Sequence, residues 1–278
     1  MLGTVARLRR YPVKSMLGED VNASMVTRHG LAGDRRLAVV SRTTGKIASA
    51  KFPRLWRDLL TLSACADDAA TVAVSITLPG GKTIWSTDAD VDEVLSAVLG
   101  EPVMLTAVPP LGAALDRAVP EAVLREGVAA EVPVEIMEIG GGGPPGTFVD
   151  FAPVHLLTTS TLDRIAELSP DRGAHSERYR PNIVIRTTRP GFTENDWLGR
   201  SLRVGDELML GVIARTPRCA VPTLAHGGLP RDAEALRVLA RHNRVQPLEG
   251  SGPEPCAGVY AEVLAPGRIQ VGDPVRLA

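Results

Sequence analysis

The chain has few aromatic residues, few cysteines and almost no net charge, and each shortage excludes a class of function. Phe, Trp and Tyr make up 4% of the 278 residues, which leaves no evident stacking platform for single-stranded nucleic acid. The net charge of −1 gives no overall field that would attract nucleic acid or an anionic membrane. Three cysteines without a CxxC pair argue against a disulfide framework and a structural zinc site.

Hydrophobic runs are short throughout. The N-terminus, MLGTVARLRRYPVKS, lacks an apolar core of signal-peptide length, and no later run approaches the roughly 18 apolar residues of a membrane-spanning helix. The five histidines show no metal-ligand spacing such as HxxxH. We therefore expect a cytoplasmic protein with no membrane or nucleic-acid partner, long enough for one large domain or two modest ones.

Residues 1–100 read mostly as short β-rich stretches separated by turn signals. The expected strands are 5–11, 21–26, 37–41, 59–63 and 72–78, with turns at 43–46 and 79–82. The first convincing helix spans 88–99, where Asp88 can cap an apolar stripe and Gly100 ends it. Many short strands with turn signals predict a barrel or sandwich with one helix added.

Glycine and proline are dense between residues 109 and 153, which marks a domain junction or a long surface loop. The glycine run at 140–143 lacks the lysine and following helix of a phosphate-binding P-loop. Further on, a helix opens at Ser160 with capping-box-like spacing and closes at Ser169-Pro170. The remaining expected elements are strands 182–186, 207–214, 259–264, 267–271 and 275–277, and a helix at 232–241.

Cys219 is the most informative single residue. It follows the strand-like run 207–214 and has Arg215 and Arg218 beside it. Arginines favour the thiolate, which is both a nucleophile and a soft-metal ligand. An isolated cysteine can equally be inert core filler, and that is the interpretation we give to Cys65.

Other polar side chains stand where a strand or helix begins or ends and can reach an anion. Lys14 and Ser15 leave the first strand, and Arg35 precedes another strand in Gly-Asp-Arg-Arg. The helix after residue 160 offers its N-terminal N–H groups, and an asparagine can meet a heterocycle edge with a donor and an acceptor. Each of these residues also has a structural explanation. Lys14 and Ser15 could lie in a solvated turn, and Arg35 could pair locally with Asp34. Ser160 could simply cap its helix, and Arg218 could face solvent.

Five stretches taken in order resemble the MOSC family, which is named after the C-terminal domain of molybdenum-cofactor sulfurases. They are Pro12-Val13-Lys14-Ser15, residues 29–35, residues 180–184, Arg218-Cys219 and the ending between residues 258 and 275. The branch they resemble carries its own N-terminal β-barrel domain and includes the mitochondrial amidoxime-reducing components. The implied fold is α+β, mostly β, with an N-terminal β-barrel-like domain at 1–108 and a MOSC β-barrel with a few helices at 109–278.

The resemblance also implies a site for the molybdenum cofactor between the two domains, with Cys219 as metal ligand and catalytic residue. The cofactor-binding residues it implies are Lys14, Ser15, Arg35, Thr158, Thr159, Ser160, Arg180, Asn182 and Arg218. The implied function is an oxidoreductase that reduces N-hydroxylated small molecules. The sequence shows no flavin or nicotinamide site, so a separate flavin, haem or iron–sulfur protein would deliver the electrons.

Two alternatives remain from the sequence alone. A cofactor-binding or sulfur-carrying module could use Cys219 to hold a persulfide, and a β-rich protein without cofactor could bury it as an inert thiol. The segment 226–255 departs from the branch because it is longer and carries its own expected helix, so it can border the pocket and alter the substrate.

Overall fold

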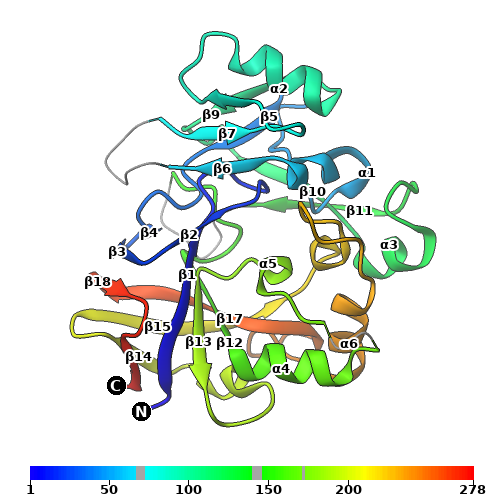
Figure 1. Ribbon diagram of the computed structural model, residues 1–278. Helices are drawn as coiled ribbons and strands as arrows, with labels where there is room; N and C mark the ends of the chain where they lie inside the picture. Colours follow the sequence, from blue (N-terminus) through cyan, green and yellow to red (C-terminus); the bar gives the residue numbers. More distant parts are fainter. Residues whose placement is uncertain (67–72, 140–145, 171–172) are drawn as a thin grey trace.

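Seven strands close into a barrel in the lower half of the computed structural model, which describes residues 1–66, 73–139, 146–170 and 173–278 (Figure 1). Around the ring, these strands are β12 (Val154–Thr158), β13 (Ile183–Thr187), β1 (Gly3–Arg10), β19 (Pro274–Leu277), β14 (Ser201–Val204), β15 (Leu208–Pro217) and β17 (Glu254–Ala265). Pairing of β12 with β17 closes the ring, and only the β12–β13 pair is parallel among the seven. Two short strands extend it, β2 (Glu19–Val21) on β1 and β16 (Arg244–Val245) on β17.

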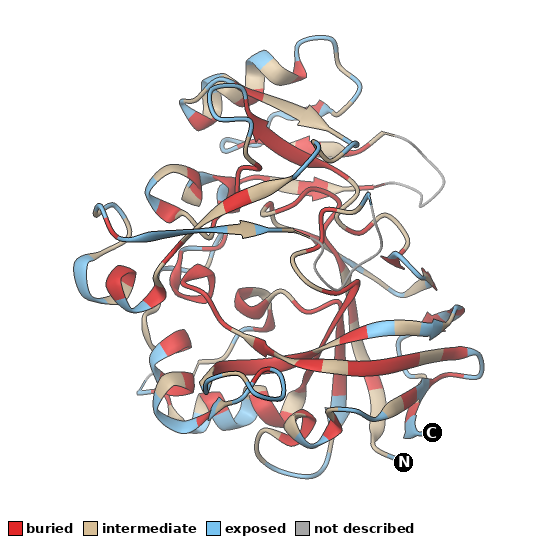
Figure 2. Ribbon diagram, turned by 180° about the vertical axis from the view of Figure 1, so that it is seen from behind, coloured by how far each residue is buried: buried red, intermediate tan, exposed pale blue. Residues whose placement is uncertain are grey.

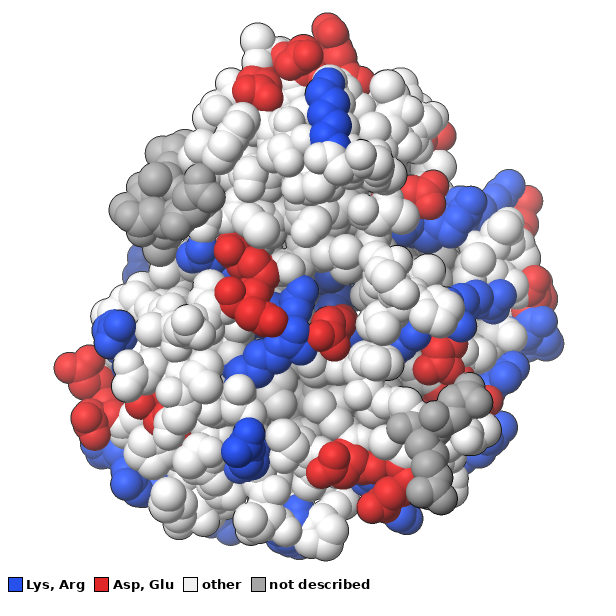
Figure 3. Space-filling model, viewed as in Figure 1, with Lys and Arg blue, Asp and Glu red and all other residues white. Residues whose placement is uncertain are grey.

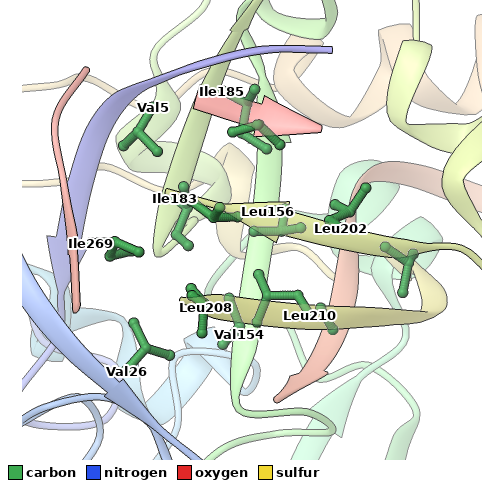
Figure 4. Close-up of a cluster of buried hydrophobic side chains, with 14 of the residues drawn as sticks. Val5, Val26, Val154, Leu156, Ile183, Ile185, Leu202, Leu208, Leu210 and Ile269 are labelled. Carbon is green, nitrogen blue, oxygen red and sulfur yellow. The ribbon is translucent and has the colours of Figure 1, made fainter. Parts of the chain in front are cut away.

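Alternating side chains of these strands fill the barrel. Val5, Leu156, Ile183 and Leu210 point toward one another from four different strands and are fully buried or nearly so (Figure 4). Burial of such aliphatic side chains contributes roughly 1.5–3 kcal/mol each. Because the ring has no free edge among its seven strands, its backbone groups are paired internally, which gives the site a rigid base.

The upper half in Figure 1 holds small sheets and a helix built from the N-terminal segment. The sheets pair β5 (Ala38–Ser41) with β9 (Val103–Thr106), and β6 (Ser63–Cys65) with β7 (Ser75–Thr77) and β8 (Thr83–Trp85). The helix α2 (Val91–Leu99) packs Val91, Leu95 and Leu99 into a second core with these strands. A separate hairpin pairs β10 (Ala114–Ala118) with β11 (Val134–Glu138).

The two ends of the chain are interleaved. The N-terminal β1 lies between β13 and β19 in the barrel, and β18 (Gly267–Gln270) from the C-terminal end joins β3 (Ala23–Thr27) and β4 (Gly30–Leu31). Both termini therefore lie together at the barrel (Figure 1). The chain leaves the barrel after β1, builds the upper half and returns at β12, so the loops between the halves face one another.

Helices cover the outside of these sheets. The helices α4 (Thr159–Leu168) and α6 (Glu234–His242) pack on the barrel through Leu157, Ile165 and Leu239. The remaining helical turns are α1 (Pro53–Trp56), η1 (Arg57–Thr61), α3 (Pro120–Glu126), α5 (Ser176–Tyr179), η2 (Thr193–Trp197) and η3 (Val221–Thr223). Among the described residues, none of these helices is long and apolar enough to cross a membrane.

The predicted fold class, mostly β with a barrel and a few helices, is confirmed, but several local predictions were wrong. Residues 57–61 form η1 where a strand was expected at 59–63, because Pro53 starts a helical turn just upstream. The expected strand 21–26 is two strands, β2 and β3, which pair with different partners. The glycine run at 140–143 lies outside the described residues.

Two predicted helix caps were also wrong. Helix α2 begins after Asp90, and the Asp88 carboxylate instead accepts a hydrogen bond from the Trp85 N–H at 2.8 Å. Helix α4 is capped by Thr158, whose hydroxyl accepts from the Thr161 N–H at 3.1 Å, so the cap lies two residues before Ser160. The division of the chain at residue 108 stays a prediction.

Buried residues follow the barrel strands and the inner faces of the upper sheets (Figure 2). On the face seen in Figure 3, acidic and basic side chains are interspersed rather than gathered into a field of one sign.

Candidate functional site

A cavity opens between the barrel and the upper half, with about 650 Å³ of space not filled by atoms, open solvent included. We call it the cationic cavity because, of the described residues that line it, five carry a positive charge and one, Asp150, a negative charge. The five are Lys14, Arg35, Lys51, Arg180 and Arg218. A deep cavity with such an excess of cations is suited to an anionic ligand.

Seven of the ten predicted site residues line this cavity, which they reach from separate loops. They are Lys14, Ser15, Arg35, Arg180, Asn182, Arg218 and Cys219. Lys14 and Ser15 follow β1, Arg35 precedes β5, and Cys219 follows β15. Because β1 and β15 are both barrel strands, the barrel fixes where these loops emerge.

Ser15, Arg35 and Arg180 share an uncommon backbone conformation. Their φ angles are 65°, 45° and 56°, and they are the only non-glycine residues with positive φ in the described part of the chain. This left-handed conformation costs a side-chain-bearing residue roughly 1–2 kcal/mol. All three strained residues line the cationic cavity, so the strain is concentrated at one place, as it is at binding and catalytic sites.

Asp150 ties two lysines together at the cavity wall. Its carboxylate lies 2.6 Å from Lys14 Nζ and 3.1 Å from Lys51 Nζ, and Lys14 also donates to the Phe148 carbonyl at 2.7 Å. Burial disfavours the charged Asp150 carboxylate, but the two ammonium groups outweigh it and hold its pKa below the usual range. Burial, with the nearby Lys51 and Arg35 charges, lowers the pKa of Lys14 to about 8.

Tyr11 carries three guanidinium groups around its ring. The Cζ atoms of Arg180, Arg35 and Arg9 lie 4.2, 5.1 and 5.8 Å from the ring centroid. Arg35 also pairs with Asp34, which accepts a hydrogen bond from the Tyr11 N–H at 2.7 Å. The faces of the Tyr11 ring attract the guanidinium groups, which helps to hold Arg35 and Arg180 beside the cavity. Asp34 is the carboxylate that pairs with this group of arginines.

Arg180 and Arg218 each keep a buried nitrogen without a hydrogen-bond partner among the described residues. These atoms are Nη1 of Arg180 and Nε of Arg218. Burial lowers the pKa of Arg180 to about 10, so the group still carries its charge at neutral pH. A buried donor without a partner costs roughly 1–3 kcal/mol, which an anion in the cavity would recover.

Asn182 and His155 are engaged within the protein. The Asn182 side-chain oxygen accepts from the His155 N–H at 3.1 Å and from Arg35 Nη1 at 3.3 Å, and its amide nitrogen donates to the Arg9 carbonyl at 3.3 Å. Burial lowers the pKa of His155 to about 3, which keeps the imidazole neutral. Asn182 therefore positions Arg35 at the cavity, in addition to lining it.

Cys219 lies at the boundary of the two halves. The residue is 8% exposed and packs with Ala50 and Leu60 from the N-terminal segment and with Val221 and Leu224. The neighbouring Arg218 donates to the Tyr179 carbonyl at 2.8 Å, which fixes the turn that presents the thiol. The thiol thus faces a cavity lined by cations, while its own flank is apolar.

Thr158, Thr159 and Ser160 do not line the cationic cavity. Thr158 donates to the buried Glu194 carboxylate at 2.6 Å, and Ser160 bonds to Thr158 and Thr193 at 2.9 Å each. Burial raises the pKa of Glu194, although the hydroxyl donors favour its charged form. The group beside the N-terminus of α4 is thus a carboxyl side chain of the protein, and a contact of these three residues with a cofactor stays a prediction.

Sequence reasoning missed Lys51, Asp150 and Tyr260, all of which line the cavity. Ser49-Ala50-Lys51 places a hydroxyl and a lysine just before a proline-started helix, the same type of signal that selected Lys14-Ser15. Asp150 lies four residues before β12 and could have been noted as a carboxylate in the segment that leads into a strand. Tyr260 lies inside β17 and carries no local signal.

The described residues contain no group of three or more His, Cys, Asp or Glu side chains that could hold a metal ion by themselves. A metal at Cys219 would need ligands from another molecule. The arrangement fits an anionic group that brings such ligands, because the cations surround the space next to the thiol.

Two family models match the chain, the MOSC domain over residues 144–276 and the MOSC N-terminal beta barrel domain over residues 2–100. Mitochondrial amidoxime-reducing component 1 of Homo sapiens is 27% identical over 99% of this chain and 83% of its own length. The Mus musculus protein of the same name is 26% identical over 99% and 82%. The solved structure of YiiM from Geobacillus stearothermophilus covers 46% of this chain and 54% of its own, at 18% identity and a TM-score of 0.32. The chain belongs to the MOSC family, with the N-terminal MOSC β-barrel domain, and is homologous to the mitochondrial amidoxime-reducing components.

Proposed function

We propose that this protein is a molybdenum-cofactor-dependent reductase of N-hydroxylated compounds. The observation that carries the proposal is the convergence of five cations and Cys219 on one cavity between the two halves. Relatives named as amidoxime-reducing components, similar over 99% of the chain, support the reaction type.

The cavity residues suit the parts of the cofactor. Lys14, Arg35 and Arg180 would meet the phosphate and the pterin, and the unpartnered Arg180 Nη1 is a donor available for such an anion. Cys219 would supply a thiolate sulfur to the metal. When bound, the cofactor would supply the two-electron redox chemistry at molybdenum.

The chain's own residues would hold and orient the reactants. Lys14, Lys51 and Asp150 form a partly buried charged cluster that lines the same cavity as the thiol, and it would fix the local charge around the reacting group. Reduction of the N–O bond consumes two electrons and two protons and releases water. A separate electron-transfer protein with a flavin, haem or iron–sulfur centre would supply the electrons.

The proposal is tested on protein produced in a host that makes the molybdenum cofactor. We expect about one molybdenum and one pterin per chain, and reduction of benzamidoxime and hydroxylamine with a reduced viologen as donor. Full molybdenum content without turnover on either substrate would contradict the reductase and favour a cofactor-binding module. A persulfide on Cys219, detected by mass spectrometry in protein without metal, would favour a sulfur carrier.

A further inference from the structure

A second cavity, with about 730 Å³ of unfilled space, open solvent included, also has Cys219 among its lining residues. It shares five wall residues with the cationic cavity, which are Lys51, Asp150, Arg218, Cys219 and Tyr260. The two cavities are therefore neighbours, and we call the five shared residues the partition, so Cys219 belongs to both.

Part of the lining of the second cavity is apolar. Met137, Phe151, Pro217, Pro247 and Leu248 line it. Phe151 and Tyr260 form an aromatic pair with ring centroids 5.5 Å apart and an angle of 43° between the rings. Such a surface favours a flat apolar body, which can lie against the rings and the aliphatic wall.

Two sets of charged groups in this cavity are paired, and Arg215 and Arg218 line it as well. At the rim, Arg117 lies 3.1 Å from Glu135 and 3.8 Å from Glu254, so these partly exposed charges are paired with one another. Inside, Lys51 Nζ lies 3.1 Å from Asp150 and 3.4 Å from the Met137 sulfur, and its side chain is 13% exposed. Lys51 thus places an ammonium group in the partition, in contact with Met137 of the apolar lining.

The wall formed by Pro247 and Leu248 is held in place by β15. The Arg215 N–H donates to the Pro247 carbonyl at 3.0 Å, and its guanidinium donates to the Gln246 carbonyl at 2.9 Å. Ser251 bonds to both the N–H and the carbonyl of Leu248, at 3.1 and 2.7 Å. This wall comes from the segment 226–255 that follows the cysteine, and its hydrogen bonds give it a fixed shape before any ligand binds.

We infer that the second cavity is the substrate subsite of the reductase and selects N-hydroxylated molecules with an aryl or similarly flat apolar body over small hydroxylamines. The inference rests on the proposed function. The apolar body lies against Phe151, Tyr260 and Leu248, and the N–O end points to the partition, where Lys51 donates a hydrogen bond to it. A molecule without the apolar body gains only the contacts at the partition.

The test uses the Leu248→Trp variant of the holoenzyme, which narrows the cavity at a residue that is 42% exposed and therefore tolerant of substitution. We expect the KM for benzamidoxime to rise about tenfold or more, and kcat/KM for hydroxylamine to stay within about twofold of wild type. Calorimetric binding of benzamidoxime to the oxidised holoenzyme should weaken by a similar factor. Leu248→Asp, which places a charge on the same wall, should act in the same direction.

The matched control is Leu264→Trp, because Leu264 is an exposed leucine on β17 that lines neither cavity. This variant should leave KM and kcat/KM unchanged for both substrates. If both substrates are reduced and both Leu248 variants bind and reduce benzamidoxime like wild type, the subsite is wrong and the reductase stands. If the molybdenum-loaded wild type reduces neither substrate, the reductase itself is wrong and the subsite falls with it.

Discussion

The guanidinium of Arg180 lies over the ring of Tyr11, with Cζ 4.2 Å from the ring centroid. Tyr11 follows the first strand of the barrel, while Arg180 ends α5 about 170 residues later. The aromatic ring of Tyr11 holds the Arg180 guanidinium at the cationic cavity. Because the contact is with the ring face, Nη1 of Arg180 keeps no hydrogen-bond partner among the described residues. The protein thus holds a buried charge in position without neutralising it, as an anion site requires.

Arg180→Ala should therefore weaken retention of the cofactor. Loss of one charge-assisted contact costs about 1.5–3 kcal/mol, or roughly ten- to a hundredfold in affinity. We expect less molybdenum per purified chain, while activity per bound molybdenum falls much less than total activity. The control is Arg186→Ala, an exposed arginine on β13. Equal molybdenum content in the Arg180 and Arg186 variants would remove Arg180 from the site.

Cys219→Ala should abolish turnover per bound molybdenum at a small cost in stability. The thiol is a cavity residue, and the removed sulfur leaves a gap that costs about 1 kcal/mol in the free energy of unfolding. Cys256→Ala is the matched control, because Cys256 is fully buried, lines neither cavity and has a thiol pKa raised to about 12 by burial. Turnover at the wild-type rate per molybdenum in Cys219→Ala would show that the metal does not need this sulfur.

A substitution at the start of helix α4 should have the reverse effect, which is a loss of stability without a loss of molybdenum. Thr158 caps the helix and donates to the buried Glu194 carboxylate, so Thr158→Val removes one cap and one donor to a buried acid. We expect the free energy of unfolding to fall by about 1–3 kcal/mol while folded protein keeps its molybdenum. Exposed Thr43→Val serves as the control. Loss of molybdenum without loss of stability would instead put Thr158 at the cofactor.

Where predicted site residues line the cationic cavity, the sequence signal was local. Lys14, Arg35 and Cys219 stand next to strand ends in short motifs, and strand ends determine where side chains emerge. Asp150 and Lys51 were missed because they are far apart in the sequence. Only the folded chain brings the Lys51 ammonium within 3.1 Å of the Asp150 carboxylate. The apolar run at 59–63 was misread because such short runs do not distinguish a strand from a helical turn.

The barrel itself could be predicted only in outline. Strands 5–11, 207–214 and 275–277 were found from their composition, but their order around the ring follows from pairings that no local pattern contains. The placement of β1 between β13 and β19 is such a pairing.

Acid should destabilise the cofactor-free protein through His155. Its folded-state pKa is about 3, lowered by burial, whereas the unfolded chain takes up a proton near pH 6.5. Between these values the unfolded state binds more protons, so stability falls as the pH is lowered through this window. From pH 7 to pH 5 the loss due to this residue is about 2 kcal/mol.

Chemical denaturation of His155→Gln at pH 7 and pH 5 measures this contribution. The variant should be less stable at pH 7, but the difference between the two pH values should shrink by about 2 kcal/mol relative to wild type. His242→Gln, at the exposed end of α6, should keep the wild-type difference. An unchanged difference in His155→Gln would mean that another group governs the acid response.

The two halves should not work apart, because the barrel needs the N-terminus. A fragment of residues 120–278 lacks β1, which pairs with both β13 and β19, so the ring of seven strands opens at that point. It also lacks β3, the partner of β18, and the cavity residues Lys14, Arg35 and Lys51. We expect no cooperative thermal transition by circular dichroism and no retained molybdenum. Co-expression with residues 1–119 as a second chain is the control, and it should restore a single transition that the cofactor raises by mass action. A fragment 120–278 that melts cooperatively and keeps molybdenum as tightly as the full chain would show that the N-terminal segment is not part of the site.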